Sequence, residues 1–157
     1  MARREFSAGL VLVRRMRGRV WFAAVRPQGK APGVWALPKG LVGKDESTAQ
    51  TAVREGFEET GLTSDLVVKL GDVRYVYTQS WGAGRGERVF KIVSFFLARS
   101  LAGRIGELPA GMEREVAEAR WLPLEDGPRL LAYRGEQDMA RRALELLEEE
   151  TTAAQAI

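Results

Sequence analysis

A group of acidic residues between Gly40 and Leu62 is the part of the sequence with the clearest chemical potential. Glu55, Glu58 and Glu59 follow one another at i, i+3 and i+4. On a helix that turns about 100° per residue, their carboxylates share about 100° of arc and lie side by side. Three like charges in this arrangement repel one another, and a divalent cation would remove the repulsion. A solvated helix face is the commoner reason for such a run, so cation binding is a hypothesis that needs further support.

The composition limits which catalytic groups the protein can use. Its 157 residues include no cysteine and no histidine. This excludes disulfide frameworks, thiolate nucleophiles, cysteine-ligated zinc and catalytic groups that depend on histidine. A metal bound by the remaining oxygen ligands would be a hard cation such as Mg²⁺ or Mn²⁺.

The charge balance and hydropathy bear on partners and location. With 24 Lys+Arg against 21 Asp+Glu the net charge is +3, which permits an anionic small-molecule substrate but does not indicate a nucleic-acid surface. No stretch approaches the roughly 18 apolar residues of a membrane span, and the N-terminal apolar run is too short for a signal peptide. We therefore expect a cytoplasmic protein with no membrane partner, either a monomer or a homodimer.

The acidic residues are positioned by a predicted helix. Apolar positions at i, i+3 and i+4 begin after Glu46 and Ser47 and end at Gly61, a typical helix-terminating glycine. A glycine-rich loop precedes this helix. Its residues Gly40 and Gly43 would let the backbone approach a metal or phosphate closely.

The sequence pattern of the rest of the chain predicts a mixed β-sheet and a second helix. Extended segments are expected at residues 5–14, 20–25, 34–38, 66–70, 73–79, 89–98 and 116–122. A helix is expected at 136–150, and residues 151–157 are expected to form a disordered tail. This order favours an α+β sandwich with a mixed sheet, in one domain over residues 1–150, and not a doubly wound fold.

The acidic stretch resembles the Nudix box, a 23-residue signature of fixed spacing. The matching positions are Gly40, Glu46, Arg54, Glu55, Glu58, Glu59, Gly61 and Leu62. One departure is Gly56, where the family usually has a small aliphatic residue. This puts local helix stability in doubt, and the neighbouring Phe57 would have to supply the packing.

The resemblance implies an α/β/α sandwich that carries a loop-helix-loop metal platform. It also implies an enzyme that hydrolyses a nucleoside diphosphate linked to another group. The residues that it assigns to metal binding are Glu55, Glu58, Glu59, the backbone carbonyl of Lys39 and, in support, Glu46. Arg54 would hold the helix carboxylates in place. Glu115 resembles the distal glutamate that completes the catalytic set, although Glu113 and Glu118 lie close enough to confuse the assignment.

The segment Leu37 to Gly40 bears on the substrate. Its Leu-Pro-Lys-Gly sequence is similar to the start of the box in dinucleoside polyphosphate hydrolases, including those that act on diadenosine polyphosphates. A lysine there would be a point-charge partner for additional phosphates. The substrate contacts expected from the sequence are Lys39, Gly40, Arg26, Tyr75, Tyr77 and Trp81. Tyr75 and Tyr77 share one strand face and could stack on a base.

Other substrates remain open at this point. Within the family they are ADP-ribose and other nucleotide sugars, nucleoside triphosphates, inositol pyrophosphates and capped RNA. A Nudix-like regulator that binds a nucleotide without hydrolysing it belongs to a different class. The complete set of box glutamates favours an enzyme.

Overall fold

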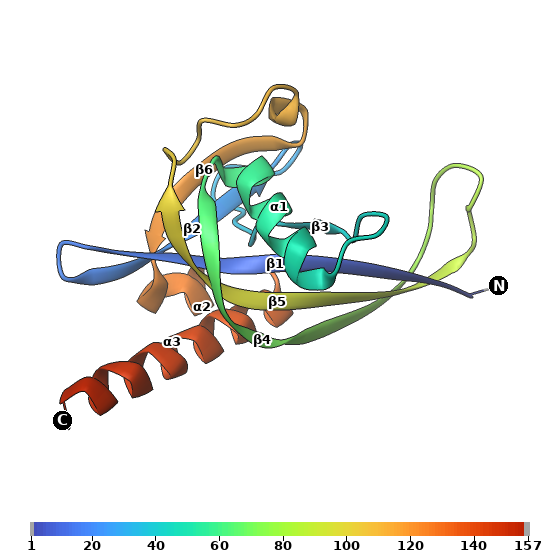
Figure 1. Ribbon diagram of the computed structural model, residues 1–157. Helices are drawn as coiled ribbons and strands as arrows, with labels where there is room; N and C mark the ends of the chain where they lie inside the picture. The colour runs from blue at the N-terminus through green and yellow to red at the C-terminus, as the bar shows by residue number, and fades with distance from the viewer. Residues whose placement is uncertain (1, 156–157) are drawn as a thin grey trace.

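In the computed structural model, which describes residues 2–155, helices lie on both faces of a β-sheet (Figure 1). The strands are β1 (Ala2–Met16), β2 (Arg19–Pro27), β3 (Lys39–Leu41), β4 (Thr63–Thr78), β5 (Arg88–Ala102) and β6 (Val116–Pro123). The α-helices are α1 (Thr48–Thr60), α2 (Gly127–Leu130) and α3 (Arg134–Gln155). Short 3₁₀ turns lie at Met112–Arg114 and Leu124–Asp126. The expected α+β sandwich is confirmed.

The sheet is mixed because β1 has neighbours in both orientations. Its order is β4-β5-β1-β2-β6, and β3 pairs with β1 outside this path. Strand β1 is parallel to β5 and antiparallel to β2 and β3. The pairing with β2 covers Val13 to Met16, whereas β3 pairs with Ser7 to Gly9. Residues Lys39–Leu41 are therefore held beside the middle of β1.

Helix α1 begins and ends where the sequence pattern predicts. Ser47 is the N-cap, and its hydroxyl accepts a hydrogen bond from the Gln50 N–H. The Gln50 side chain in turn accepts one from the Ser47 N–H. This reciprocal pair satisfies two N–H groups that the helix start would otherwise leave free. Gly61 ends the helix with φ of +83°, a conformation that glycine adopts without steric cost.

Gly56 determines how closely α1 approaches the sheet. A Cβ atom added here would lie 2.5 Å from Leu10 Cδ1 of β1, so the lack of a side chain permits the close contact. Phe57 does not supply this packing, since 41% of its surface is exposed. The departure from the box pattern is thus matched by the packing of the helix on β1.

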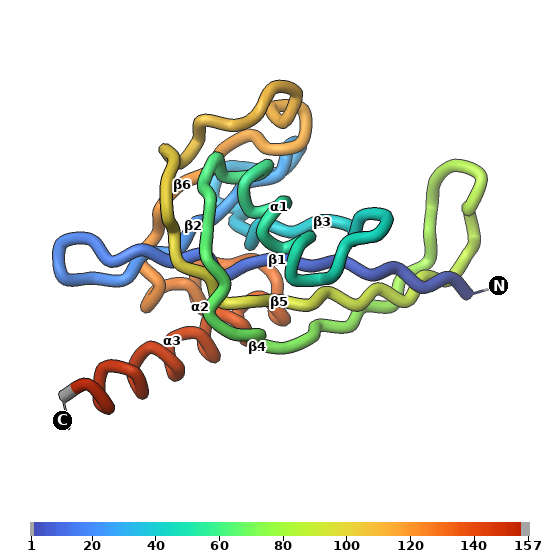
Figure 2. The backbone as a smooth tube through the Cα atoms, in the orientation of Figure 1, coloured from blue at the N-terminus to red at the C-terminus, as the bar shows by residue number. Residues whose placement is uncertain are grey.

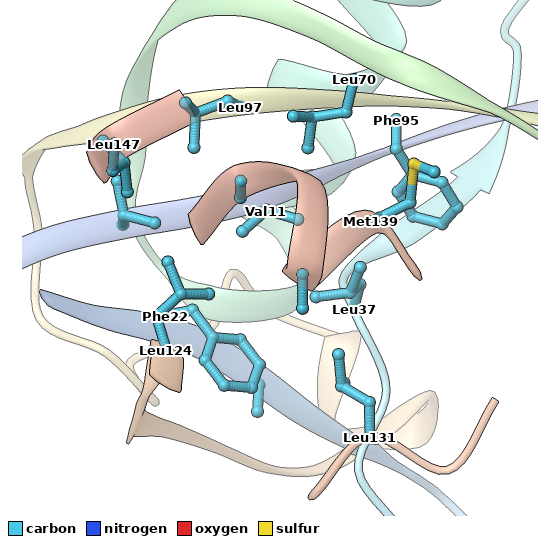
Figure 3. Packing of buried hydrophobic residues seen from close by; sticks show 14 of the residues in the cluster. Val11, Phe22, Leu37, Leu70, Phe95, Leu97, Leu124, Leu131, Met139 and Leu147 are labelled. Atoms are coloured by element: carbon cyan, nitrogen blue, oxygen red, sulfur yellow. The ribbon is translucent and has the colours of Figure 1, made fainter. Parts of the chain in front are cut away.

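Two apolar cores fix the helices to the sheet. The core beneath α1 consists of Ala8, Leu10, Leu12, Ala23, Ala52, Leu62, Phe96 and Ala98. The larger core beneath α3 includes Val11, Phe22, Leu37, Leu70, Phe95, Leu97, Leu124, Leu131, Met139 and Leu147 (Figure 3). Successive β1 residues alternate between the two because neighbouring side chains of a strand point to opposite faces. Leu37 and Leu131 tie two connecting segments into the second core.

Three strand expectations differ from the structure. The segments 66–70 and 73–79 form one long strand, β4, whose pairing with β5 tolerates register shifts near Leu66 and Lys69. Residues 39–41 belong to an expected loop but form β3, because their backbone pairs with β1. The extended segment at 34–38 makes only isolated bridges.

The C-terminal helix is longer than its apolar repeat predicts. Helix α3 begins at Arg134 and continues to Gln155, so the first part of the expected disordered tail is helical. The Thr151 hydroxyl donates a hydrogen bond of 3.0 Å to the Leu147 carbonyl in this extension. The last two residues of the expected tail, 156–157, lie outside the described residues.

The loop between β4 and β5 extends away from the sheet, near the N-terminal end of β1 (Figure 2). It corresponds to the glycine-rich segment that begins near Trp81. Among residues 2–155, no helix combines the length and the apolar character needed to cross a membrane.

Candidate active site

The guanidinium of Arg54 organises most of the acidic cluster, by which we mean Glu46, Glu55, Glu58 and Glu59. Its Nη1 lies 3.0 Å from Glu55 Oε1 and 3.1 Å from Glu58 Oε2. Its Nε and Nη2 each donate a 2.8 Å hydrogen bond to the Glu46 carboxylate. One planar cation thus contacts three carboxylates and offsets the repulsion among them.

Glu46 supports Arg54 and the loop before α1. Besides Arg54, its carboxylate accepts hydrogen bonds from the Gly43 N–H and the Thr51 hydroxyl, both at 2.9 Å. These hydrogen bonds, above all those from Arg54, lower the pKa of Glu46 to about 2. A Cβ atom at Gly43 would overlap the Glu46 carboxylate. The geometry therefore matches a supporting role, with both carboxylate oxygens already engaged.

Glu59 is a more buried carboxylate of the same helix. Its Oε1 accepts a hydrogen bond from the Lys39 N–H at 3.2 Å, which joins α1 to β3. Burial raises the pKa of Glu59 to about 8, and the negative charges of Glu55 and Glu115 contribute to the rise. A bound cation would favour the ionised form instead.

Glu55 faces the backbone of β3. A Cβ atom at Gly40 would overlap its carboxylate, so the glycine permits the close approach between strand and helix. Burial, and then the negative charge of Glu58, raise the pKa of Glu55. Glu55 and Glu59 are thus carboxylates in surroundings that disfavour their ionised form unless a cation is bound.

A pocket of about 200 Å³ adjoins these carboxylates. It is lined by Val25, Pro27, Ala36, Leu37, Lys39, Gly40, Glu59, Lys91, Glu115 and Val116. We call it the acidic pocket, because Glu59 and Glu115 both line it. Residues from β3, α1, β5 and the start of β6 therefore meet at one place.

The acidic pocket distinguishes Glu115 from its acidic neighbours. Glu113 accepts a hydrogen bond of 3.0 Å from the Gly111 N–H, and Glu118 pairs with Arg26 at 3.5 Å. Neither of these glutamates lines the pocket. Among the three candidates for the distal glutamate, the structure brings Glu115 to the acidic cluster.

A second pocket, of about 350 Å³, lies next to the first. It is lined by Pro27, Lys39, Tyr75, Val76, Tyr77, Lys91, Tyr133 and Glu136, and we call it the tyrosine pocket. The two pockets share Pro27, Lys39 and Lys91. Burial, and then the positive charge of Lys39, lower the pKa of Lys91. Two ammonium groups that influence each other thus lie where the pockets meet.

Two expected substrate contacts lie elsewhere. Arg26 donates a hydrogen bond of 3.1 Å to the Lys30 carbonyl besides its contact with Glu118, and it lines neither pocket. Trp81 is 60% exposed and stacks on Tyr77, with ring centroids 6.3 Å apart. Trp81 therefore extends the aromatic surface beyond the tyrosine pocket instead of lining it.

Tyr133 and Glu136 line the tyrosine pocket but were not expected there from the sequence. Tyr133 lies between two helices, in a segment with no pattern of its own. Glu136 occupies the first turn of α3, where an acidic residue is ordinarily explained by the helix dipole. Its complete burial is the unusual feature, and the sequence carries no sign of that.

The carboxylates have the ligand chemistry that hard cations require. Glutamate and backbone oxygens suit Mg²⁺ or Mn²⁺, and Gly40 lets backbone and carboxylate come together. Among residues 2–155, no three acidic side chains converge as a preformed ligand set, since Arg54 holds Glu55 and Glu58 while the Lys39 N–H holds Glu59. Rotation of these side chains would be needed to enclose a cation. After that rotation, the glutamate and backbone oxygens would suit a Mg²⁺ or Mn²⁺ ion.

Comparison with known proteins gives relatives of one family. The putative mutator protein MutT4 of Mycobacterium tuberculosis (strain CDC 1551 / Oshkosh) is 37% identical over 115 residues, which are 73% of this chain and 43% of that protein. The chain therefore spans less than half the length of this relative. An RNA pyrophosphohydrolase of Erythrobacter litoralis (strain HTCC2594) is 32% identical over 135 residues, which are 79% of each chain.

Solved structures agree on the fold. An Ap4A hydrolase of C. elegans in a binary complex has a TM-score of 0.71 and 24% identity, and the match covers 92% of this chain and 98% of that one. The family model described as NUDIX domain matches residues 3–145, which include the acidic cluster, both pockets and the N-terminal half of α3. The chain belongs to the NUDIX domain family.

Proposed function

We propose that the protein is a metal-dependent pyrophosphohydrolase that cleaves dinucleoside polyphosphates, such as a diadenosine polyphosphate. The observation that carries this proposal is the junction of the two pockets at Lys39 and Lys91. A ligand lying across that junction would place its phosphates beside two ammonium groups. The carboxylates would lie at one end of it and an aromatic surface at the other.

The proposed cation is Mg²⁺ or Mn²⁺. Its ligands would be Glu55, Glu58, Glu59, Glu115 and the backbone carbonyl of Lys39. Such a cation acts as a Lewis acid toward phosphate oxygens. Glu46 remains the support of Arg54, because hydrogen bonds already engage its carboxylate.

Glu59 and Glu115 are the proposed proton acceptors for the attacking water. Both line the acidic pocket, where the attacking water would lie. Whichever of the two carboxylates does not coordinate the cation would be free to accept the proton. Arg54 holds the neighbouring carboxylates and has no part in the proton transfer.

The tyrosine pocket would take a nucleobase. Tyr75, Tyr77 and Tyr133 present aromatic rings there, and stacking of a base on an aromatic side chain contributes about 1–3 kcal/mol in nucleic-acid complexes. Trp81, stacked on Tyr77, would extend this surface toward the second nucleoside. Lys39 and Lys91 supply charge for a phosphate chain longer than that of ADP-ribose.

Removal of a 5′ pyrophosphate from RNA is a second candidate function. It is favoured by the relative from Erythrobacter litoralis, which is named RNA pyrophosphohydrolase and matches over most of both chains. An RNA 5′ end also offers a nucleobase and a short phosphate chain. The small net charge of +3 gives less support to an RNA-binding surface.

A substrate panel tests the proposal. Diadenosine tetraphosphate, ADP-ribose, a nucleoside triphosphate and 5′-triphosphorylated RNA would be incubated with the protein and Mg²⁺ or Mn²⁺, and the products separated by chromatography. We expect the highest kcat/KM for diadenosine tetraphosphate. A higher value for RNA would favour the second candidate, and binding without hydrolysis of any compound would indicate a nucleotide-binding regulator.

A further inference from the structure

Glu136 is a buried carboxylate that links α3 to the segment before α1. None of its surface is exposed. Its Oε1 accepts a 2.6 Å hydrogen bond from the Leu37 N–H, and its Oε2 lies 2.8 Å from the Lys39 ammonium. A carboxylate removed from water is costly unless it is both paired and hydrogen-bonded. The two contacts together therefore hold Glu136 and the Leu37–Lys39 backbone in one arrangement.

Lys39 continues this connection to the acidic helix. Its side chain pairs with Glu136, and its ammonium lies 5.6 Å from the centre of the Tyr133 ring. Its backbone N–H donates to Glu59. Burial opposes the charged form of Lys39, but the charge and hydrogen bond of Glu136, together with the negative charge of Glu59, outweigh burial and raise the pKa of Lys39. Because an ammonium has three N–H donors, the pair with Glu136 leaves two for a ligand at the pocket junction.

We propose that Glu136 is a positioning residue that acts on both pockets through Lys39. It fixes the backbone of residues 37–39 so that the Lys39 N–H meets Glu59. It also directs the Lys39 ammonium to the junction where the phosphate chain would lie. The role toward phosphate rests on the proposed function. The role toward the backbone of residues 37–39 does not depend on any substrate.

Two substitutions separate these roles. Glu136→Gln keeps an acceptor for the Leu37 N–H and removes the charge that holds the Lys39 ammonium. We expect KM for diadenosine tetraphosphate to rise roughly tenfold, the effect of one charge-assisted contact, with kcat nearly unchanged. Glu136→Ala removes both contacts, so kcat should fall as well, because Glu59 loses its fixed partner. Glu145→Gln, on the exposed side of the same helix, is the matched control.

A second background tests whether Glu136 acts through Lys39. In a Lys39→Met protein, Glu136→Gln should change KM little further, because the ammonium that it positions is gone. Such non-additivity is the signature of two residues that act as one unit. The same fold-change in KM in both backgrounds would overturn the proposal, since the carboxylate would then act independently of Lys39.

An activity-free measurement completes the test. In ¹H–¹⁵N NMR spectra of the metal-free protein, the Leu37 and Lys39 amide resonances should shift in Glu136→Ala and stay in place in Glu145→Gln. The near-isosteric Gln variant carries the test through its Lys39 resonance if the Ala variant does not fold. Unmoved amides would overturn the positioning role. Shifted amides in a protein whose wild type hydrolyses none of the substrate panel would support the positioning role and overturn the proposed function.

Discussion

The three glutamates of α1 are held in different ways. Glu58 is the most exposed of them, so its substitution should disturb the fold least. It pairs with Arg54 and keeps 32% of its side chain exposed. Glu58→Gln preserves size and removes the charge that a cation would require. We expect turnover to fall on the order of 100-fold or more, with little change in Tm. Steady-state assays and thermal unfolding check this. Near wild-type turnover by a folded variant would contradict the ligand assignment.

Glu59 should give the metal-free protein a pH-dependent stability. Burial raises the pKa of Glu59 to about 8, above the value of about 4.3 in an unfolded chain. The folded state then binds more protons than the unfolded state between these two values, so stability falls as pH rises from about 5 to 8. Glu59→Gln removes this loss.

The corresponding measurement is Tm in chelator at pH 5, 6.5 and 8. We expect the Tm of Glu59→Gln to exceed that of the wild type by several degrees more at pH 8 than at pH 5, since each pH unit between the two pKa values costs the wild type up to about 1.4 kcal/mol. Glu145→Gln controls for the loss of a carboxylate at the surface. Parallel pH profiles for wild type and Glu59→Gln would show that burial does not disfavour the ionised form of this residue.

The residues of the acidic cluster were predictable because they share one helix. Helical phase alone places Glu55, Glu58 and Glu59 on one side, and Arg54 is local to them. Glu136 was not predictable in this way, because it lies 99 positions from its partner Leu37. Only the packing of α3 against the sheet brings the two together.

At the scale of elements, Gly56 provides a test of how α1 is seated. Gly56→Ala would improve helix propensity by about 1 kcal/mol, but the new methyl group would lie 2.5 Å from Leu10 Cδ1 in a fully buried core. Overpacking costs about 1–3 kcal/mol, so we expect a net loss of stability and a lower Tm.

The Leu10→Val background supplies the control for this prediction. Shortening Leu10 removes the methyl group that the new Cβ atom would meet, so Gly56→Ala should lower Tm less there than in the wild type. Thermal unfolding of the four proteins gives the comparison. An increase in Tm on Gly56→Ala in the wild type would mean that helix propensity outweighs the packing constraint.

Elements with a local signal were predictable, and those defined by pairing were not. Helix α1 was placed by its apolar repeat, its N-cap and Gly61. Strand β3 was expected as a loop, because its three residues become a strand only by pairing with β1. The two segments of β4 were separated by Gly71, which the pairing with β5 accommodates through a shift in register.

For the whole molecule, the sequence predicted a mixed-sheet sandwich but not how its layers meet. The order of elements favours helices on both faces of a sheet. The strand order and the split of β1 between β2 and β3 depend on long-range contacts. That split places Lys39 where α1, β5 and α3 converge, so the junction of the two pockets is a property of the complete fold.

For the whole molecule, hydrolysis should depend on a divalent cation, because the clustered carboxylates need a positive charge to bind a phosphate chain beside them. The protein would be freed of bound metal, and hydrolysis of diadenosine tetraphosphate followed in excess chelator and again after Mg²⁺ or Mn²⁺ is restored, with circular dichroism recorded in each state. We predict that turnover is abolished by chelator and regained with the cation while the fold is unchanged, and that the apparent affinity for the cation improves as pH rises toward 8, because protons and cation compete for the clustered carboxylates. Turnover that persists in excess chelator on metal-free protein would contradict metal-dependent hydrolysis.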